Sequence, residues 1–193
     1  MAFQRWCEMV GLDIKPHQVE GFDWCMRREQ DKTMPGGIVC DEMGLGKTIL
    51  MVACIELGVQ NKPTLVVVPP SLLQQWKEVF EKFVLDDSIF VYHGYAAKNI
   101  TLSELKSKRI VLTTYGMIAH RKSPEYKSML WGIHWARIIC DEAHHARNPK
   151  TNICKGLMKI VIRTKIKWFV TGTPIQNKLC DIRVLFTLMG NYI

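Results

Sequence analysis

The stretch "CDEMGLGKT" (residues 40–48) decides the fold, because it is typical of a loop that binds nucleotide phosphates. Its last three residues fit the pattern G-x-x-x-x-G-K-[ST], although Asp41 stands where that pattern has its first glycine. Backbone N–H groups converge on phosphate oxygens only where the chain adopts unusual dihedral angles, which Gly44 and Gly46 allow. The stretch therefore predicts a phosphate-binding loop.

The residues on either side of this loop support the same prediction. A strand-like run, "GGIVC" (36–40), enters the loop, and a helix-like run, "TILMVACIEL" (48–57), leaves it. A helix that begins at the loop directs its positive end toward the bound anion. Lys47 would then neutralise phosphate charge, and the Thr48 hydroxyl would be a ligand of Mg²⁺. Without this context, the same letters would describe only a glycine-rich turn.

Other apolar runs predict an α/β fold with a doubly wound, mainly parallel sheet and helices on both faces. They lack polar alternation, as strands covered on both faces do: "TLVVVP" (64–69), "SIFVY" (88–92), "RIVLTT" (109–114), "RIIC" (137–140) and "KWFVT" (167–171). Segments of helical character lie between several of them: 47–60, 71–84, 115–121 and 151–162. In the second segment apolar residues recur at three- and four-residue spacing, and Ser71 is the expected N-cap.

Composition indicates one soluble domain inside the cell. The 193 residues are 48% hydrophobic and 23% charged, and no apolar run reaches the length of roughly 18 residues that a membrane span needs. The N-terminus lacks the apolar core of a secretory signal. The seven cysteines show no C-x-x-C spacing, so we expect buried, reduced thiols and no zinc. The formal charge of +8 favours an anionic partner such as nucleic acid.

A second chemical signal lies in "RIICDEAHHARN" (137–148), where Asp141 and Glu142 end a strand-like run. After a phosphate loop, the first acid at such a position holds Mg²⁺ and the next polarises the attacking water. Alone, the pair could simply end a strand and cap a helix. We expect the adjacent His144 and His145 to point apart, which argues against a metal site between them.

The ordered motifs resemble the Swi/Snf-type ATPases of helicase superfamily two. The motifs span nearly the whole chain: "KPHQVEGFDW" (15–24), "DEMGLGKT" (41–48), "LVVVPPSLLQQW" (65–76), "VLTTYGM" (111–117), "IICDEAHHARN" (138–148) and "VTGTPIQN" (170–177). The wording "MPGGIVCDEMGLGKT" is nearest to the subgroup that contains the helicase-like transcription factor. In this branch "DE" commonly precedes "MGLGKT", so Asp41 is no lesion. The resemblance implies a RecA-like lobe over residues 1–193.

This resemblance also implies roles for individual residues. Gln18 would recognise adenine, Lys47 and Glu142 would be catalytic, and Thr48 and Asp141 would hold Mg²⁺. The implied ATP contacts are Gln18, Asp41, Glu42, Met43, Gly44, Leu45, Gly46, Lys47 and Thr48. The residues implied in coupling the ATP site to the nucleic-acid surface are His144, Thr171, Thr173 and Gln176. Those implied in contacts with the backbone of double-stranded DNA are Pro70, Ser71, Thr113, Thr114 and Tyr115.

Family enzymes have two lobes, with ATP in the cleft between them. Nothing that resembles the arginine-rich block of a second lobe follows Asn177. We therefore expect this chain to be the N-terminal lobe of a longer ATPase. Because an arginine finger contributes about 10³- to 10⁵-fold in rate, we expect the lobe alone to bind ATP weakly and to hydrolyse almost none.

Four readings stay open from the sequence. The first is a lobe of a translocase on double-stranded DNA, which would be nuclear in a eukaryote and cytoplasmic in a bacterium or a cytoplasmic virus. The second is another superfamily-two enzyme, such as a restriction-type translocase or an RNA helicase, although "GTPIQN" argues against the latter. The third is a GTPase or a small-molecule kinase, but neither "NK" site is followed by the aspartate of N-K-x-D. The fourth is a platform for docking without catalysis.

Overall fold

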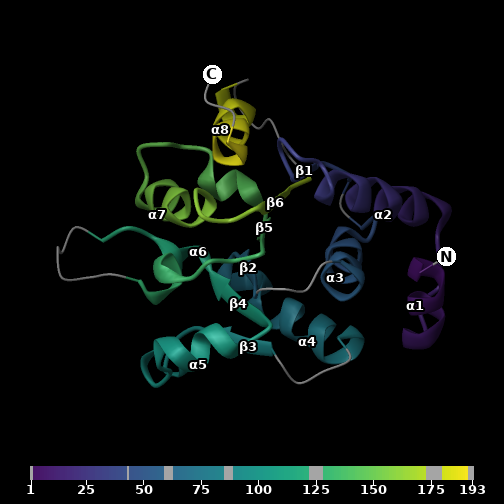
Figure 1. Ribbon diagram of the computed structural model, residues 1–193, viewed down its shortest axis with the longest axis horizontal. Coiled ribbons are helices and arrows are strands. Elements are labelled where there is room, and N and C mark those ends of the chain that lie inside the picture. The colour runs from purple at the N-terminus through teal and green to yellow at the C-terminus, as the bar shows by residue number, and fades with distance from the viewer. Residues whose placement is uncertain are drawn as a thin grey trace.

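A computed structural model describes residues 2–42, 44–58, 63–84, 89–121, 128–172 and 180–190. A six-stranded sheet in the order β1-β6-β5-β2-β4-β3 runs through the centre of the molecule (Figure 1). All its neighbouring strands are parallel. The strands are β1 (Gly36–Val39), β2 (Thr64–Val68), β3 (Ile89–Tyr92), β4 (Ile110–Thr114), β5 (Arg137–Asp141) and β6 (Ile166–Val170). The predicted parallel sheet is therefore confirmed.

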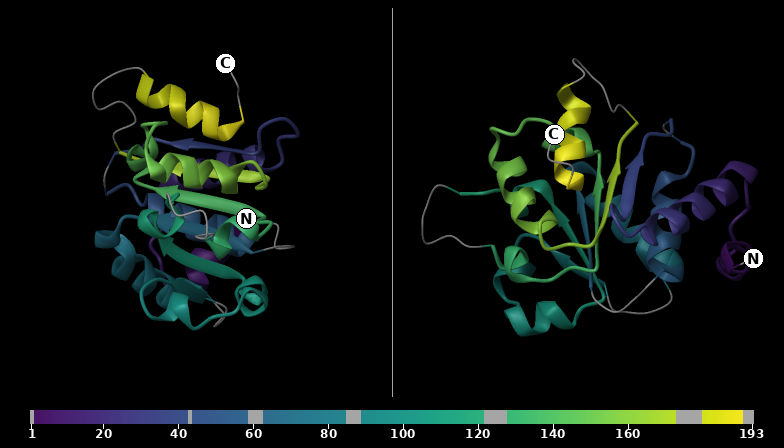
Figure 2. Two further views of the ribbon diagram at one scale, coloured as in Figure 1. Left: turned by 90° about the vertical axis from the view of Figure 1, so that its left-hand side faces the viewer. Right: turned by 45° about the horizontal axis from the view of Figure 1, so that its top comes forward.

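Helices cover both faces of this sheet, as Figure 2 shows. One face carries α1 (Ala2–Val10), α2 (Pro16–Glu29), α3 (Lys47–Leu57) and α4 (Leu73–Phe83). The other carries α5 (Leu102–Ser107), α6 (Tyr115–Ile118), α7 (Asn152–Val161) and α8 (Cys180–Met189). Short 3₁₀ turns complete the described structure: η1 (Pro70–Leu72), η2 (Ala96–Lys98), η3 (Met129–Gly132) and η4 (Ala143–Ala146). This arrangement confirms the predicted doubly wound fold.

Two apolar cores, one on each side of the sheet, explain why the strand runs show no polar alternation. Along β5, Ile138 and Cys140 pack into the core beneath α7, whereas Ile139 packs into the core beneath α3. All three side chains are fully buried. Because successive strand residues point to opposite faces, a strand covered on both sides is apolar at every position.

The prediction of Ser71 as a helix N-cap is wrong. Pro69 and Pro70 lead into the 3₁₀ turn η1, so α4 begins at Leu73 and has Leu72 at its N-cap position, without a side-chain cap. The predicted apolar face of this helix is present, since Trp76, Phe80 and Phe83 are buried. Periodicity thus located the face of the helix, while the proline pair determined its start.

The cysteines largely follow the prediction. Among the six cysteines whose side chains the structure describes, Cys7, Cys25, Cys54, Cys140 and Cys154 are buried, whereas Cys40 is exposed. Cys40 differs because it follows the last residue of β1, where the chain leaves the sheet for the phosphate loop.

Among the described residues, no helix combines the length and the apolar character that a membrane span requires.

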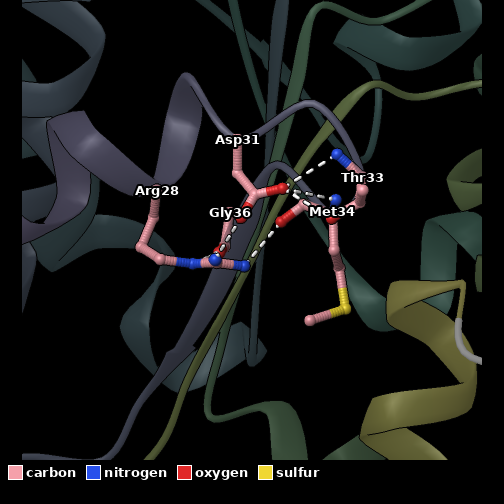
Figure 3. Close-up of polar contacts among 5 residues, drawn as sticks. All are labelled: Arg28, Asp31, Thr33, Met34 and Gly36. Atoms are coloured by element: carbon pink, nitrogen blue, oxygen red, sulfur yellow. Dashed lines mark hydrogen bonds and ion pairs between the residues drawn. The ribbon is translucent and has the colours of Figure 1, made fainter.

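A polar cluster fixes the connection between α2 and β1 (Figure 3). The Arg28 guanidinium donates to the Gly36 and Met34 carbonyl oxygens at 2.9 and 2.6 Å, and to the Asp31 carboxylate at 2.6 Å. Asp31 also accepts hydrogen bonds from the backbone N–H groups of Thr33 and Met34 at 2.8 and 3.0 Å. This cluster ties the end of α2 to the start of β1, and so fixes α2 beside the phosphate loop.

The first prediction concerns the pH dependence of this cluster. Hydrogen bonds from the Met34 N–H and from Thr33, together with the Arg28 charge, hold the pKa of Asp31 well below its usual range. The stabilisation is therefore present above the unfolded pKa of about 3.9 and is lost as pH falls through the folded pKa. We expect Asp31→Asn to lower the urea midpoint at pH 7. The difference in urea midpoint between Asp31→Asn and the wild type should become smaller below about pH 4. A difference in midpoint that does not change with pH would contradict this account.

Candidate nucleotide and nucleic-acid site

The phosphate loop has the backbone geometry that its glycines predict. Gly44 and Gly46 both lie in the left-handed region, with φ of 85° and 84°. Gly46 is the N-cap of α3, and its carbonyl accepts the first helical hydrogen bond, from Leu50 N–H at 3.0 Å. The space where a Gly44 side chain would lie is open within 4 Å, so a ligand has access to the backbone there. The loop therefore presents the start of a helix to an approaching anion.

Lys47 lies at the start of α3 and folds back over the loop. Its ammonium group donates to the carbonyl oxygens of Asp41 and Glu42 at 2.7 and 2.8 Å. The side chains of these two acidic residues are exposed. Lys47 is thus held above the loop by backbone groups, so its charge lies where the glycine backbone is accessible. Met43 lies outside the described residues.

The predicted adenine residue, Gln18, lies against this loop. Its Oε1 accepts a hydrogen bond from the Lys15 N–H at 3.3 Å, and its amide is so near Gly46 that any side chain at that position would collide with it. His17 Nε2 approaches the Leu45 carbonyl oxygen at 3.2 Å. The first turn of α2 and the phosphate loop are therefore in direct contact, although they are about 28 residues apart in sequence.

A pocket of about 440 Å³ opens between α2, the end of β1 and the phosphate loop. Its volume is in the range that small-molecule sites have, about 300–1,000 Å³. Its lining combines an indole, aliphatic side chains and a few polar groups, among them those of His17, Glu20, Trp24, Val39, Asp41 and Leu45. A flat heterocycle attached to phosphates on the loop would fit such a lining.

The acid pair lies at the same edge of the sheet as the phosphate loop. Asp141 ends β5 and is buried, with Oδ2 accepting from Trp76 Nε1 at 2.7 Å and Oδ1 accepting from the Glu142 N–H at 2.9 Å. Burial raises the pKa of Asp141, and the two hydrogen bonds and the Lys47 charge oppose that rise. Each carboxylate oxygen of Asp141 therefore accepts a hydrogen bond that helps to fix its orientation.

Glu142 connects the acid pair to two predicted coupling residues. Its Oε2 lies 3.2 Å from His144 Nδ1 and 3.5 Å from the Thr171 hydroxyl, which is itself 3.3 Å from His144 Nδ1. Thr171 is fully buried after β6, and its N–H donates to the Val39 carbonyl of β1 at 3.0 Å. The fold thus brings together Glu142, His144 and Thr171, while Thr173 and Gln176 lie outside the described residues.

The expectation that the adjacent histidines point apart is wrong. The rings of His144 and His145 stack at 4.7 Å, and His145 in turn stacks on Tyr115 at 5.3 Å. They lie in the 3₁₀ turn η4, which is wound more tightly than an α-helix. Burial and the neighbouring His144 lower the pKa of His145.

The backbone at Glu142 predicts an unusual response to mutation. Glu142 has φ of 49° and is the only non-glycine residue with positive φ in the described part of the chain. That conformation costs an ordinary residue about 1 kcal/mol, and glycine avoids the cost. We expect Glu142→Gly to be about 1 kcal/mol more stable than Glu142→Ala in urea unfolding. Both variants lack the carboxylate, so the difference between them reports only the cost of the left-handed backbone. An alanine variant as stable as the glycine variant would contradict the assignment of strain.

Comparison with known proteins identifies the family. The SNF2-related domain matches residues 17–193. The chain belongs to this family. ATP-dependent helicase rhp16 of Schizosaccharomyces pombe is 36% identical over 191 residues, which cover 92% of this chain and 21% of the relative. The ISWI chromatin-remodeling complex ATPase ISW1 of Saccharomyces cerevisiae is 30% identical over 188 residues, covering 93% of this chain and 16% of the relative.

A solved structure shares the fold of this SNF2-related domain. It is a SWI2/SNF2 ATPase core of Sulfolobus solfataricus in complex with double-stranded DNA, with a TM-score of 0.76 and 32% identity. The match covers 91% of this chain and 35% of the solved chain. The predicted resemblance to Swi/Snf-type proteins is therefore confirmed. The present chain spans about a fifth of the length of the curated relative rhp16.

The segments predicted to contact DNA differ in exposure within this SNF2-related domain. Pro70 and Ser71 are exposed in η1. Thr113, Thr114 and Tyr115 are buried, and the Thr113 and Tyr115 hydroxyls donate within the protein, to the Tyr92 and Asp141 carbonyl oxygens at 2.8 Å each. A DNA contact by Thr113, Thr114 or Tyr115 stays a prediction. Because their side chains are buried, such a contact would have to be made by their backbone, where β4 passes into α6.

The donors near the loop fit Mg²⁺ that arrives with a nucleotide. Among the described residues, no group of three or more His, Cys, Asp or Glu side chains could hold a metal by itself. Mg²⁺ commonly takes one or two carboxylates together with substrate phosphates and water, and so needs no cage made only of protein. Asp141 supplies one such carboxylate at the end of β5, and Thr48, the second residue of α3, supplies a hydroxyl next to the phosphate loop.

Sequence reasoning missed Trp76 as a site residue and missed one contact of Tyr115, which was predicted only to contact DNA. Both residues bond to Asp141, Trp76 through the carboxylate and Tyr115 through the backbone carbonyl. In the sequence, Trp76 fits the apolar face of a helix. Nothing nearby indicates that its indole N–H bonds to a residue 65 positions away. An aromatic donor at that position of "PPSLLQQW" was the only hint.

Proposed function

We propose that this SNF2-related domain is the ATP-binding lobe of a DNA-dependent ATPase that moves along double-stranded DNA to remodel protein–DNA complexes or DNA structures. The observation that carries the proposal is the convergence of three parts at one sheet edge: the glycine loop with Lys47, the acid pair Asp141 and Glu142, and the exposed turn η1. Such a site suits phosphoryl transfer driven by positioning and electrostatics.

Each part has a role in the proposed reaction. The loop N–H groups and Lys47 bind the β- and γ-phosphates, while Gln18 and the pocket beside α2 receive adenine. Asp141 and the Thr48 hydroxyl would hold Mg²⁺, which would supply charge neutralisation to the phosphates when bound. Glu142 accepts a proton from the attacking water as general base, and His144 and Thr171 orient its carboxylate.

The proposal includes a second RecA-like lobe in the same full-length protein. The arginines of that lobe would neutralise charge in the transition state, which typically contributes about 10³- to 10⁵-fold in rate. The 193-residue chain alone is therefore expected to bind ATP but to turn it over hardly at all. In a eukaryotic source, the substrate would place the protein in the nucleus.

Double-stranded DNA is the proposed nucleic-acid partner. The net charge of +8 favours a polyanion, and the exposed turn η1 would contact phosphates without reading bases. Support also comes from the 32% identity to a SWI2/SNF2 ATPase core that was solved in complex with double-stranded DNA. The remaining alternatives are another superfamily-two translocase or helicase, and a lobe that only docks other molecules.

DNA binding and ATP turnover by the 193-residue chain test this proposal together. Fluorescence anisotropy should give salt-sensitive binding to a labelled 20-base-pair DNA duplex of mixed sequence, and weaker binding to an RNA duplex of the same sequence. Adding the DNA duplex should produce almost no ATP turnover. Preference for RNA would favour a helicase of another kind, and rapid DNA-stimulated turnover would contradict the need for a second lobe.

A further inference from the structure

We infer that Trp76 is a positioning residue for Asp141 and that it ties the proposed Mg²⁺ acid to the turn η1. The inference rests on the proposed function, because it assigns a role in the same site. The link is a single hydrogen bond from Trp76 Nε1 to Asp141 Oδ2, 2.7 Å long, between residues 65 apart in sequence. Nothing in the local sequence requires these two residues to meet.

The hydrogen bond fixes which way the carboxylate faces. Trp76 is 1% exposed and Asp141 is 7% exposed, so bulk water does not replace the indole as a donor. The second oxygen accepts from the Glu142 N–H at 2.9 Å, so the plane of the carboxylate is set by two donors. Each oxygen keeps a lone pair for a metal ion or its water. Donors of this kind around a ligand tune both its orientation and its affinity for metal.

The same hydrogen bond connects Asp141 to the turn η1, which is the proposed contact with DNA. Trp76 lies in the first turn of α4, directly after η1, whose Pro70 and Ser71 are exposed. The hydroxyl of Tyr115, the first residue of α6, donates to the Asp141 backbone carbonyl at 2.8 Å. Asp141 is thus held by its side chain from α4, which directly follows the candidate DNA contact η1, and by its backbone from Tyr115, itself a candidate for DNA contact. Because α4 directly continues η1, a shift of η1 would move Trp76 and, through its hydrogen bond, the Asp141 carboxylate.

Trp135 is a buried tryptophan whose indole bonds only to the backbone nearby. Trp135 is also 1% exposed, and its Nε1 donates to a neighbouring backbone carbonyl, that of Leu130, at 3.0 Å. Trp76 instead donates to the carboxylate at the end of β5. A bond to a charged acceptor is shorter and stronger than one to a neutral carbonyl. Trp135 therefore provides a control that loses a comparable buried hydrogen bond far from the acid pair.

The test compares Trp76→Phe with Trp135→Phe in the 193-residue chain. Binding of a fluorescent ATP analogue is measured while Mg²⁺ is titrated, with thermal unfolding measured alongside. We expect Trp76→Phe to need about 10-fold more Mg²⁺ for half-maximal binding, and Trp135→Phe to need the same as the wild type. If Trp76→Phe does not fold, benzothienylalanine at position 76 keeps the ring shape and removes only the N–H.

A second measurement adds duplex DNA to the same Mg²⁺ titrations. DNA should shift the Mg²⁺ requirement of the wild type and of Trp135→Phe, and should not shift that of Trp76→Phe. An unchanged Mg²⁺ requirement in Trp76→Phe, or an equal rise in both variants, would overturn the role of Trp76. A DNA shift that survives in Trp76→Phe, or is missing in the wild type, would overturn the link to η1. Failure of the wild type to bind the nucleotide at all would instead overturn the proposed function.

Discussion

Lys47→Ala is expected to weaken the binding of Mg²⁺·ATP to this domain by about 10- to 100-fold. The ammonium group of Lys47 now donates to two carbonyl oxygens of the loop, and on nucleotide binding it would exchange these for phosphate oxygens. Charge-assisted hydrogen bonds contribute about 1.5–3 kcal/mol, which corresponds to that loss of affinity. Titration with a fluorescent ATP analogue at saturating Mg²⁺ measures the change.

The matched control for this prediction is Lys155→Ala. Lys155 is exposed on α7, so its removal changes the net charge equally without touching the loop. It should bind the nucleotide within twofold of the wild type at moderate salt. The prediction fails if Lys47→Ala also binds within twofold of the wild type, because the loop would then be a turn between core elements and no phosphate site.

Arg137→Met is expected to destabilise the domain by about 3–5 kcal/mol, because it leaves the Glu29 charge buried without its partner. Arg137 is 1% exposed in β5, and its Nε and one terminal nitrogen donate to the two Glu29 carboxylate oxygens at 2.6 Å each. Trp168 Nε1 donates to the same carboxylate at 2.9 Å, and Arg137 also donates to the Thr64 hydroxyl at 3.3 Å. The pair therefore joins α2 to three strands.

Urea unfolding at pH 7 measures this loss, and a double variant controls for the change in volume. Glu29→Leu combined with Arg137→Met removes both charges, so it should recover much of the stability lost in Arg137→Met alone. If Arg137→Met lowers the free energy of unfolding by less than about 1 kcal/mol, the Glu29 carboxylate is stabilised by other groups or by water. The ion pair is then not central to the packing.

The sheet could be predicted from the sequence because each strand is covered on both faces. Strand β2 is apolar at all positions after Thr64, and β5 is apolar at its three central positions, so their runs stand out without any partner being known. The phosphate loop and the acid pair were each predicted at the end of a strand-like run, and in the structure both lie after strands of the same parallel sheet. The start of α4 could not be predicted, because a proline pair replaced the expected cap with a 3₁₀ turn.

The long-range polar contacts could not be predicted in the same way. Arg137 and Glu29 are 108 residues apart, and an arginine at the start of an apolar run gives no sign of which carboxylate it meets. The left-handed conformation of Glu142 and the stacked rings of His144 and His145 also depend on packing around η4. Periodicity tells which face a residue occupies, whereas these features depend on what lies opposite that face.

The position of the metal in a crystal of this domain, grown with a nonhydrolysable ATP analogue and Mn²⁺, tests the account most directly. Anomalous scattering locates Mn²⁺ without reference to the protein. We expect one peak between the Thr48 hydroxyl and the Asp141 carboxylate, with the phosphates on the loop N–H groups and adenine in the pocket that Trp24 lines. A nucleotide bound elsewhere, or Mn²⁺ remote from both oxygens, would contradict the assignment of this sheet edge as the ATP site.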